Sequence, residues 1–254
     1  IMFGDFLSLA FDQLCNHACK FRWMYNNQVR VPMVVRTPMG GRRGYGPTHS
    51  QSMEKFFLGI PGLRVVAPNT LDDPGPLLAR TIQAAEDPVL FVEHKILYTR
   101  EVRDETKAAD LEFHRVDGTA TARLRGAPAP LVTLACYGYM AELALEAMMR
   151  LALEREIFVE TIIFTTLAPF DPAPLVEAVA RTRRLVIAEE GTGFLGWGAE
   201  VAALATEKLG GRQPLAVRRV AARDTIIPST RVLEDAVLPG AAEIMSAAAA
   251  LGSP

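Results

Sequence analysis

One histidine lies in the part of the sequence best suited to chemistry. His49 follows a loop of glycine, proline and polar residues, residues 37–48, and stands where that loop meets a predicted helix. Loops held by a rigid scaffold are where binding and catalytic side chains gather. Because an imidazole exchanges a proton near neutral pH, His49 is a candidate general acid or base, although a lone histidine is more often structural.

Other polar side chains lie close to this histidine. Ten consecutive positions contain Arg42, Arg43, Tyr45, His49 and Gln51. Tyr45 and Gln51 are weaker candidates, as neighbours that support His49, and Ser50 is expected to cap the next helix. The glycines of residues 40–46 lack the Lys-Ser/Thr pair of a phosphate-binding P-loop, so we interpret this stretch as a mobile surface loop.

A second glycine motif matches a dinucleotide fingerprint. Gly191-Thr-Gly-Phe-Leu-Gly196 has the pattern Gly-x-Gly-x-x-Gly between a predicted strand and a predicted helix. Glu189 and Glu190 come directly before it, and their charges would repel a pyrophosphate at the helix N-terminus. A tight packing turn is therefore the preferred interpretation.

A third motif loosely matches the magnesium-diphosphate motif of thiamine enzymes. Gly4-Asp5 is followed later by Asn26-Asn27, but Phe6 stands where the last glycine of that motif would be. Asp5 is expected at the start of a helix, where an N-cap role explains it fully. The motif therefore predicts no metal site, and the metal ligands stay unknown.

Composition excludes several classes of protein. The 254 residues are 50% hydrophobic and 22% charged, with a formal net charge of −2, so the chain folds and lacks a basic surface for nucleic acid. No apolar run reaches the roughly 18 to 20 residues of a membrane span. Three cysteines and no visible secretory signal indicate a reducing compartment, the cytoplasm. Cys15 and Cys19 are expected as small buried residues rather than zinc ligands.

Alternating helical and strand-like patterns predict an α/β protein of two domains, each a mainly parallel sheet with helices on both faces. The expected domains are residues 1–99 and 130–254, joined by a surface linker at 100–129. Strands are expected at 31–35, 63–66, 89–92, 131–135, 158–164, 185–188 and 216–220. Helices are expected at 6–21, 50–58, 72–85, 141–154, 174–181, 197–209 and 241–251.

Several strings resemble the beta subunit of the thiamine-diphosphate-dependent 2-oxo acid dehydrogenases. In the first half they are Gly44-Tyr-Gly-Pro-Thr-His-Ser-Gln-Ser52, Phe57-Leu-Gly-Ile-Pro-Gly-Leu-Arg-Val-Val-Ala-Pro68 and Glu93-His-Lys-Ile-Leu-Tyr98. In the second half they are Thr166-Leu-Ala-Pro169 and Gly196-Trp-Gly-Ala-Glu200. The resemblance implies a thiamine pyrimidine-binding domain that lacks its N-terminal part, followed by a transketolase C-terminal domain.

The resemblance also implies roles for individual residues. Met2 and Phe6 match residues that line the cofactor's pyrimidine ring and stack on it. His49 matches the family histidine near the 2-oxo acid and the incoming lipoyl group, with Tyr45 and Gln51 as neighbours. The implied reaction is oxidative decarboxylation followed by acyl transfer, in which the cofactor does the carbanion chemistry.

Cofactors and partners follow from the same resemblance. The family uses thiamine diphosphate, with magnesium held mainly by an alpha subunit in a two-alpha, two-beta assembly. A lipoyl-bearing acyltransferase is the further partner, and the substrate is open among pyruvate, branched-chain, acetoin-linked and less familiar 2-oxo acids. A structural potassium site would use backbone carbonyls near Met33 and residues 82–87.

Two departures from the family keep alternatives open. The family's catalytic glutamate lies upstream of Ile1, and the apolar start Ile1-Met2-Phe3 is interpreted as the end of an interior strand, so this segment alone is expected to be inactive. Ile163 and Thr165 stand where the family usually has a charged Asp and Arg. The alternatives are a single-chain transketolase-like or deoxyxylulose-phosphate-synthase-like enzyme, and a non-catalytic assembly subunit.

Overall fold

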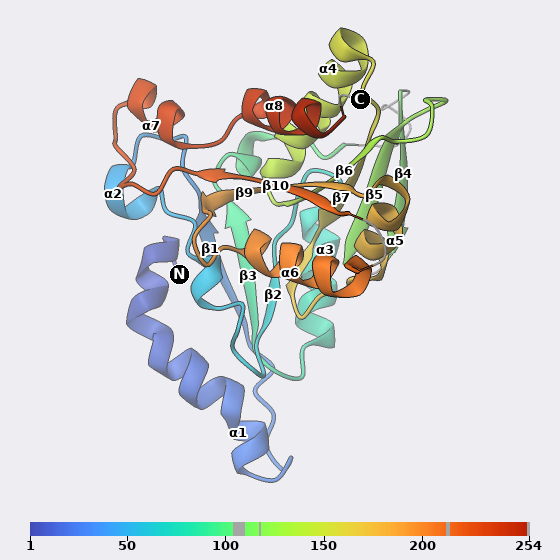
Figure 1. The fold of residues 1–254 in the computed structure, drawn as a ribbon. Coiled ribbons are helices and arrows are strands. Elements are labelled where there is room, and N and C mark those ends of the chain that lie inside the picture. The colour runs from blue at the N-terminus through green and yellow to red at the C-terminus, as the bar shows by residue number, and fades with distance from the viewer. Residues whose placement is uncertain (104–109, 117, 212–213, 253–254) are drawn as a thin grey trace.

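Two β-sheets surrounded by helices form the framework of the computed structural model, which describes residues 1–103, 110–116, 118–211 and 214–252 (Figure 1). One sheet has four strands in the order β1-β3-β2-β8, and the other has six in the order β10-β9-β6-β7-β5-β4. Most neighbouring strands are parallel. The predicted α/β class with two mainly parallel sheets is confirmed.

The first sheet positions the histidine loop. Its parallel strands are β1 (Val34–Met39), β3 (Val89–His94) and β2 (Arg64–Val66). The middle strand β3 is buried up to its last residue, which suits a strand covered on both faces. The fourth strand, β8 (Thr166–Ala168), comes from the second half of the chain and pairs antiparallel with β2. The two halves therefore share a sheet.

The second sheet has helices on both faces. Its parallel strands are β6 (Val132–Tyr137), β7 (Val159–Phe164), β9 (Arg184–Thr192) and β10 (Ala216–Ala222). The helices α4 (Met140–Arg155) and α8 (Ala241–Gly252) cover one face, and α5 (Ala173–Thr182) and α6 (Trp197–Leu209) cover the other (Figure 1). Leu134 and Cys136 face one core while Ala135 and Tyr137 face the other, as alternation along a strand requires.

The expected surface linker is wrong over most of its described length. Strands β4 (Leu111–Val116) and β5 (Thr119–Leu124) pair antiparallel, and β5 also pairs with β7. Residues 104–109 and 117 of that span lie outside the described residues. The strand pair was missed because β4 is an exposed edge strand, whose charged side chains hide its period-2 pattern. The domain limits 1–99 and 130–254 stay a prediction.

A helical segment at the N-terminus packs against the first sheet. It runs through a 3-10 turn η1 (Gly4–Ala10), a π-helical turn η2 (Gln13–Ala18) and α1 (Cys19–Met24), close to the helix predicted at 6–21. Cys15 and Cys19 are free and buried, and burial raises the pKa of Cys19 to about 11. Both thiols are core residues, as the sequence predicted.

Two predictions near the chain's first half are wrong in detail. Residues 50–58 form no single helix, because α2 (Gly46–His49) ends before Ser50 and only the short turn η3 (Glu54–Phe56) follows. Residues 1–3 form no strand, although the Ile1 nitrogen donates to the Arg36 carbonyl at the free edge of β1 (2.8 Å). Helix α3 (Pro74–Ala84) agrees with its prediction, with Asp73 as N-cap.

A short helix in the second half of the chain was also not expected from the sequence. Helix α7 (Arg231–Val237) lies beside α2 and reaches the histidine loop through Glu234 (Figure 1). Among the described residues no helix is long and apolar enough to cross a membrane.

Candidate functional site

His49 is the last residue of α2 and has neighbours on several sides. The Phe3 ring stacks on its imidazole, with centroids 4.1 Å apart and planes 11° from parallel. The Phe6 ring meets it edge-on at 5.4 Å. The Asp5 Oδ1 atom lies 2.8 Å from His49 Nδ1. Three residues of the N-terminal segment therefore fix one histidine that is distant in sequence.

Asp5 is not the helix cap that the sequence predicted. Phe3 occupies the N-cap position of η1, and no side chain there accepts a capping hydrogen bond. The Asp5 carboxylate points to His49 instead, and its side chain is only 15% exposed. Sequence spacing gave no signal for this pair, because 44 residues separate its members.

Tyr45 and a buried lysine complete the surroundings of His49. The Tyr45 ring packs against Phe3 with centroids 5.6 Å apart. Lys95 follows β3, is 5% exposed, donates to the His49 carbonyl and lies 5.7 Å from both the Phe3 and the Tyr45 ring centroids. Burial lowers the pKa of Lys95 to about 8, and the charges of nearby carboxylates oppose that shift. No local pattern indicates a role for Lys95, because its partners come from other elements of the fold.

The other side chains predicted for the site are Gln51, Met2 and Phe6, and they differ in how they relate to His49. Gln51 donates to the Thr48 carbonyl (3.0 Å), and its own carbonyl accepts from the Gly40 amide (3.1 Å), so it supports the turn around His49. Met2 is 73% exposed. Phe6 is 39% exposed, with its covered side at His49, which leaves an aromatic surface open beside the imidazole.

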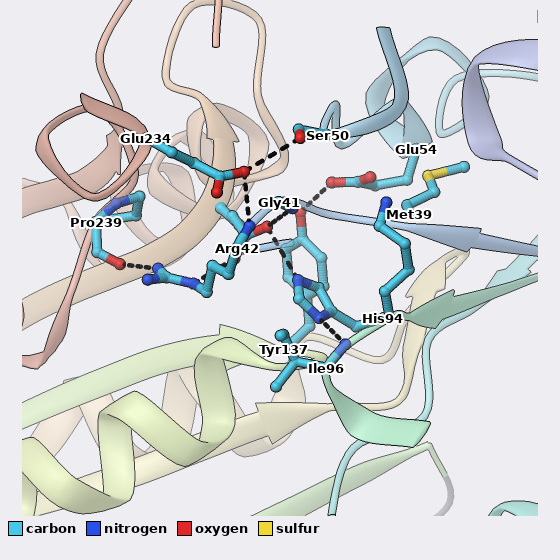
Figure 2. Close-up of polar contacts among 12 residues, drawn as sticks. Met39, Gly41, Arg42, Ser50, Glu54, His94, Ile96, Tyr137, Glu234 and Pro239 are labelled. Atoms are coloured by element: carbon cyan, nitrogen blue, oxygen red, sulfur yellow. Dashed lines mark hydrogen bonds and ion pairs between the residues drawn. The ribbon is translucent and has the colours of Figure 1, made fainter. Parts of the chain in front are cut away.

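The loop before His49 is anchored, contrary to the expected mobile surface loop. Glu234 accepts hydrogen bonds from the Arg42 amide (2.8 Å) and the Gly44 amide (3.1 Å). Glu190 accepts from the Gly41 amide (2.7 Å) and from Arg42 Nε (3.1 Å), as Figure 2 shows in part. The anchoring carboxylates come from β9 and α7, so sequence composition could not reveal them.

Ser50 is a further correction. Its hydroxyl donates to Glu234 Oε1 (3.1 Å) instead of capping a helix (Figure 2). Glu234 is 1% exposed, so this carboxylate is fully engaged inside the molecule. The residue next to His49 is thereby fixed to the second half of the chain.

The two glutamates before the glycine-rich turn have different environments. Glu190 also contacts His94 Nε2 at 2.9 Å. Although burial opposes ionisation, His94, Arg42 and the Gly41 amide lower the pKa of Glu190 to about 2. Burial raises the pKa of Glu189 to about 7, and the charge of nearby Glu54 acts in the same direction.

The turn at residues 191–196 is a packing turn. Glu189 Oε1 accepts from the Gly198 amide (3.1 Å) at the start of α6, so the chain's own carboxylate occupies the helix N-terminus. A Cβ at Gly196 would lie 2.4 Å from Glu189 Oε2, which explains the glycine there. The dinucleotide interpretation has no support in this geometry.

The side chains and carbonyls that could bind a metal ion were compared with the sites that the resemblance implies. Within the described ranges no group of three or more His, Cys, Asp or Glu side chains could hold a metal ion. Near the implied potassium site, the Met33 carbonyl accepts from the Val89 amide (2.8 Å). Arg22 donates to the Glu86 carbonyl (3.3 Å) and to Asp87 Oδ1 (2.7 Å), so a guanidinium already supplies positive charge there.

Comparison with known proteins defines the class of the chain. Residues 1–101 match the family described as transketolase, pyrimidine binding domain, and residues 121–244 match transketolase, C-terminal domain. A solved structure titled "Split gene transketolase, inactive beta4 tetramer" shares the fold, with a TM-score of 0.72 at 21% identity over 99% of this chain and 76% of that one. Both halves are therefore of the transketolase type.

Relatives in sequence narrow the class to one family. The chain is 35% identical to the beta subunit of acetoin:2,6-dichlorophenolindophenol oxidoreductase of Cupriavidus necator, over 98% of this chain and 71% of that protein. It is 33% identical to the mitochondrial pyruvate dehydrogenase E1 component subunit beta-1 of Arabidopsis thaliana, over 96% of this chain and 66% of that protein. The chain belongs to the beta-subunit family of thiamine-dependent 2-oxo acid dehydrogenases.

Proposed function

We propose that this chain is the beta subunit of a thiamine-diphosphate-dependent dehydrogenase, in which His49 serves oxidative decarboxylation of a 2-oxo acid and acyl transfer to a lipoyl group. The observation that carries the proposal is the immobilised, 31% exposed His49 side chain beside the partly open Phe6 ring. A proton-transfer group next to a flat aromatic surface suits proton transfer beside a planar ring held by stacking.

The residues present fit one end of the cofactor. Phe6 offers an aromatic face on which a pyrimidine ring can stack, and the exposed Met2 lies four residues before it in the sequence. The described residues offer no acidic cluster for magnesium, so the diphosphate end is assigned to an alpha chain. When bound, thiamine diphosphate supplies the electron sink for decarboxylation.

The chain's own residues supply orientation and proton transfer. Phe3 and Asp5 hold the imidazole in place, and Lys95 fixes the backbone at its carbonyl. His49 orients the substrate carboxylate and moves a proton during acyl transfer. Tyr45 bounds the same space through its contact with Phe3.

The proposed assembly contains two alpha and two beta subunits and a lipoyl-bearing acyltransferase. It rests on the beta-subunit names of the relatives and on the absence of a magnesium site among the described residues. The implied potassium site near Met33 and residues 82–87 does not fit these contacts, because the Arg22 guanidinium already binds the Glu86 carbonyl and Asp87. A cytoplasmic location is proposed from the free thiols of Cys15, Cys19 and Cys136.

The test removes the imidazole from the assembled enzyme. With the full-length beta chain and its alpha chain, His49→Ala is expected to lower acyl transfer to a lipoyl acceptor by about 100-fold or more. The dissociation constant for thiamine diphosphate, measured by calorimetry, stays within about threefold, because the imidazole is not needed for ring stacking. His17→Ala is the matched control, since His17 lies on the exposed side of the N-terminal segment.

Unchanged transfer in His49→Ala would remove His49 from the reaction. An assembly that binds the alpha chain but converts no 2-oxo acid would support the non-catalytic subunit instead.

A further inference from the structure

We propose that Asp5 is the positioning residue of His49: it fixes the imidazole with the proton on Nδ1 and leaves Nε2 as the atom that transfers protons. The inference rests on the proposed function of His49 and adds the residue that makes this imidazole competent. The observation behind it is the 2.8 Å contact between Asp5 Oδ1 and His49 Nδ1.

The geometry leaves one ring nitrogen available. A carboxylate accepts hydrogen bonds and cannot donate one when ionised, so Nδ1 must carry the proton in this contact. Phe3 covers a face of the ring, and the Phe6 ring packs against it with the two planes 68° apart, which fixes the ring plane. Among the described residues Nε2 has no hydrogen-bond partner, and the side chain is 31% exposed. The unprotonated nitrogen therefore lies where a substrate can reach it.

Local backbone structure holds the carboxylate in place. Asp5 lies in the 3-10 turn η1, where Ser8 Oγ donates to the Asp5 carbonyl (2.7 Å) and the Phe6 amide donates to the Phe3 carbonyl (3.1 Å). A Cβ at Gly4 would lie 2.5 Å from the Met39 side chain, so this turn packs directly on β1. Asp5 thus approaches His49 from a segment that is itself fixed.

Other charged groups near the imidazole act from different elements. Lys95 at the end of β3 donates to the His49 carbonyl, and the Arg43 guanidinium donates to the Lys95 carbonyl (3.4 Å). Tyr45 faces the Phe3 side of the site. Neither Lys95 nor Arg43 contacts the ring nitrogens, so Asp5 is the acceptor that selects the tautomer.

A second Asp-His contact on the same segment provides an internal control. Asp12 Oδ2 lies 3.5 Å from His17 Nδ1, and these side chains are 65% and 44% exposed. That pair has the same chemistry but a longer contact in solvent, which makes it weak. Any effect specific to the site must appear at Asp5 and not at Asp12.

The test replaces the carboxylate with an amide in the full-length beta chain, assembled with its alpha chain. In Asp5→Asn the side-chain amide can donate to Nδ1, which favours the tautomer with the proton on Nε2. Acyl transfer is expected to fall by about 100-fold, while KM for the 2-oxo acid changes less than about threefold.

A second readout does not depend on turnover. Diethylpyrocarbonate modifies unprotonated imidazole nitrogens, so peptide mapping of the His49 peptide is expected to show a several-fold slower reaction in Asp5→Asn. Asp5→Glu is expected to restore part of both the transfer rate and the modification rate. Asp12→Asn leaves both rates at the wild-type value.

The outcomes separate this inference from the proposed function. If His49→Ala abolishes transfer but Asp5→Asn matches wild type in transfer rate and modification rate, the inference is overturned and the function stands. If His49→Ala itself changes nothing, the proposed function fails. Should Asp5→Asn fail to fold, Asp5→Ala decides, because it also removes the carboxylate, and an unchanged transfer rate and modification rate in that variant contradict the inference.

Discussion

Two adjacent carboxylates on β9 have opposite proton affinities although both are buried. Burial opposes ionisation of Glu190, but its contacts with the His94 imidazole, the Arg42 guanidinium and the Gly41 amide lower its pKa to about 2. Burial raises the pKa of Glu189 to about 7 and the charge of Glu54 acts in the same direction, while the hydrogen bond from the Gly198 amide opposes the shift. Successive side chains point to opposite faces of a strand, which gives neighbours in sequence different neighbours in space.

The difference separates two structural tasks. The Glu190 side anchors the loop that leads to His49, through Gly41 and Arg42. On the other face of the strand, Glu189 accepts a hydrogen bond from the Gly198 amide and so connects the turn to the start of α6. The hydrogen bond from Tyr137 to Glu54 belongs to this same side. Burial alone therefore says little about a carboxylate, because the partners that arrive with the fold decide its charge.

The largest expected effect tests the anchored side. Glu190→Gln is expected to lower the free energy of unfolding by about 3 kcal/mol, because it leaves Arg42 and His94 beside a neutral acceptor in a buried place. Urea unfolding of the full-length beta chain measures this change. Glu189→Gln is the matched control, with an expected change under about 1 kcal/mol, since that carboxyl holds a proton for much of the neutral range. An equal decrease in the free energy of unfolding in both variants would show that Glu189 and Glu190 contribute equally to stability.

The pH dependence of stability sharpens the same comparison. The folded-state pKa of Glu190 lies below its ordinary value of 4.5, so its stabilisation is present above pH 4.5 and is lost as the pH falls toward about 2. The folded-state pKa of Glu189 lies above 4.5, so its contribution is fully present below pH 4.5 and is lost as the pH rises through about 7.

Unfolding curves from pH 3 to 8 check both windows. Glu190→Gln is expected to reduce the loss of stability in acid, and Glu189→Gln is expected to reduce the loss between pH 5 and 8. A wild-type profile that stays flat from pH 5 to 8 would contradict the raised pKa of Glu189.

The smallest effect concerns the Glu189 side alone. Tyr137→Phe removes the buried hydrogen bond from Tyr137 to Glu54 and is expected to cost about 1 kcal/mol in the free energy of unfolding. Acyl transfer in the assembled enzyme stays within about twofold, because the loop to His49 is held from the Glu190 side. Tyr98→Phe is the control, since Tyr98 also binds a glutamate, Glu93, but is exposed. A large loss of transfer in Tyr137→Phe would show that the two sides are coupled.

The strands that could be predicted from the sequence are those with a continuous apolar run of their own. The β-branched runs at β3 and β7 become strands buried on both faces, as their sequences indicate. Strand β8 pairs with a strand about 100 residues away, and β4 is an exposed edge, so local patterns were insufficient for both. The helix expected at 50–58 does not form, because the Ser50 hydroxyl, expected to cap it, donates a hydrogen bond to Glu234 of α7 instead.

The candidate site also contains residues that the sequence indicates and residues that only the fold brings together. His49 could be found because a histidine between a glycine-rich loop and a helix is visible in the sequence. Asp5 could not be found in this way, because its position in the sequence is explained by a helix cap. Only the fold shows that its carboxylate lies at His49 Nδ1. The loop at residues 40–46 looked mobile because its anchors, Glu190 and Glu234, are about 150 and 190 residues further along the chain.

The sequence by itself determined the α/β class, the family and the histidine at the centre of the proposed chemistry. These depend on hydrophobic periodicity and on short motifs, which are local properties of the chain. Tertiary structure alone decided the tautomer available to His49, the charge of Glu190 against that of Glu189, and the rigidity of the histidine loop. Each of these depends on which charges and donors meet across a buried interface, where a single neighbour a few ångströms away outweighs the residue's own preference.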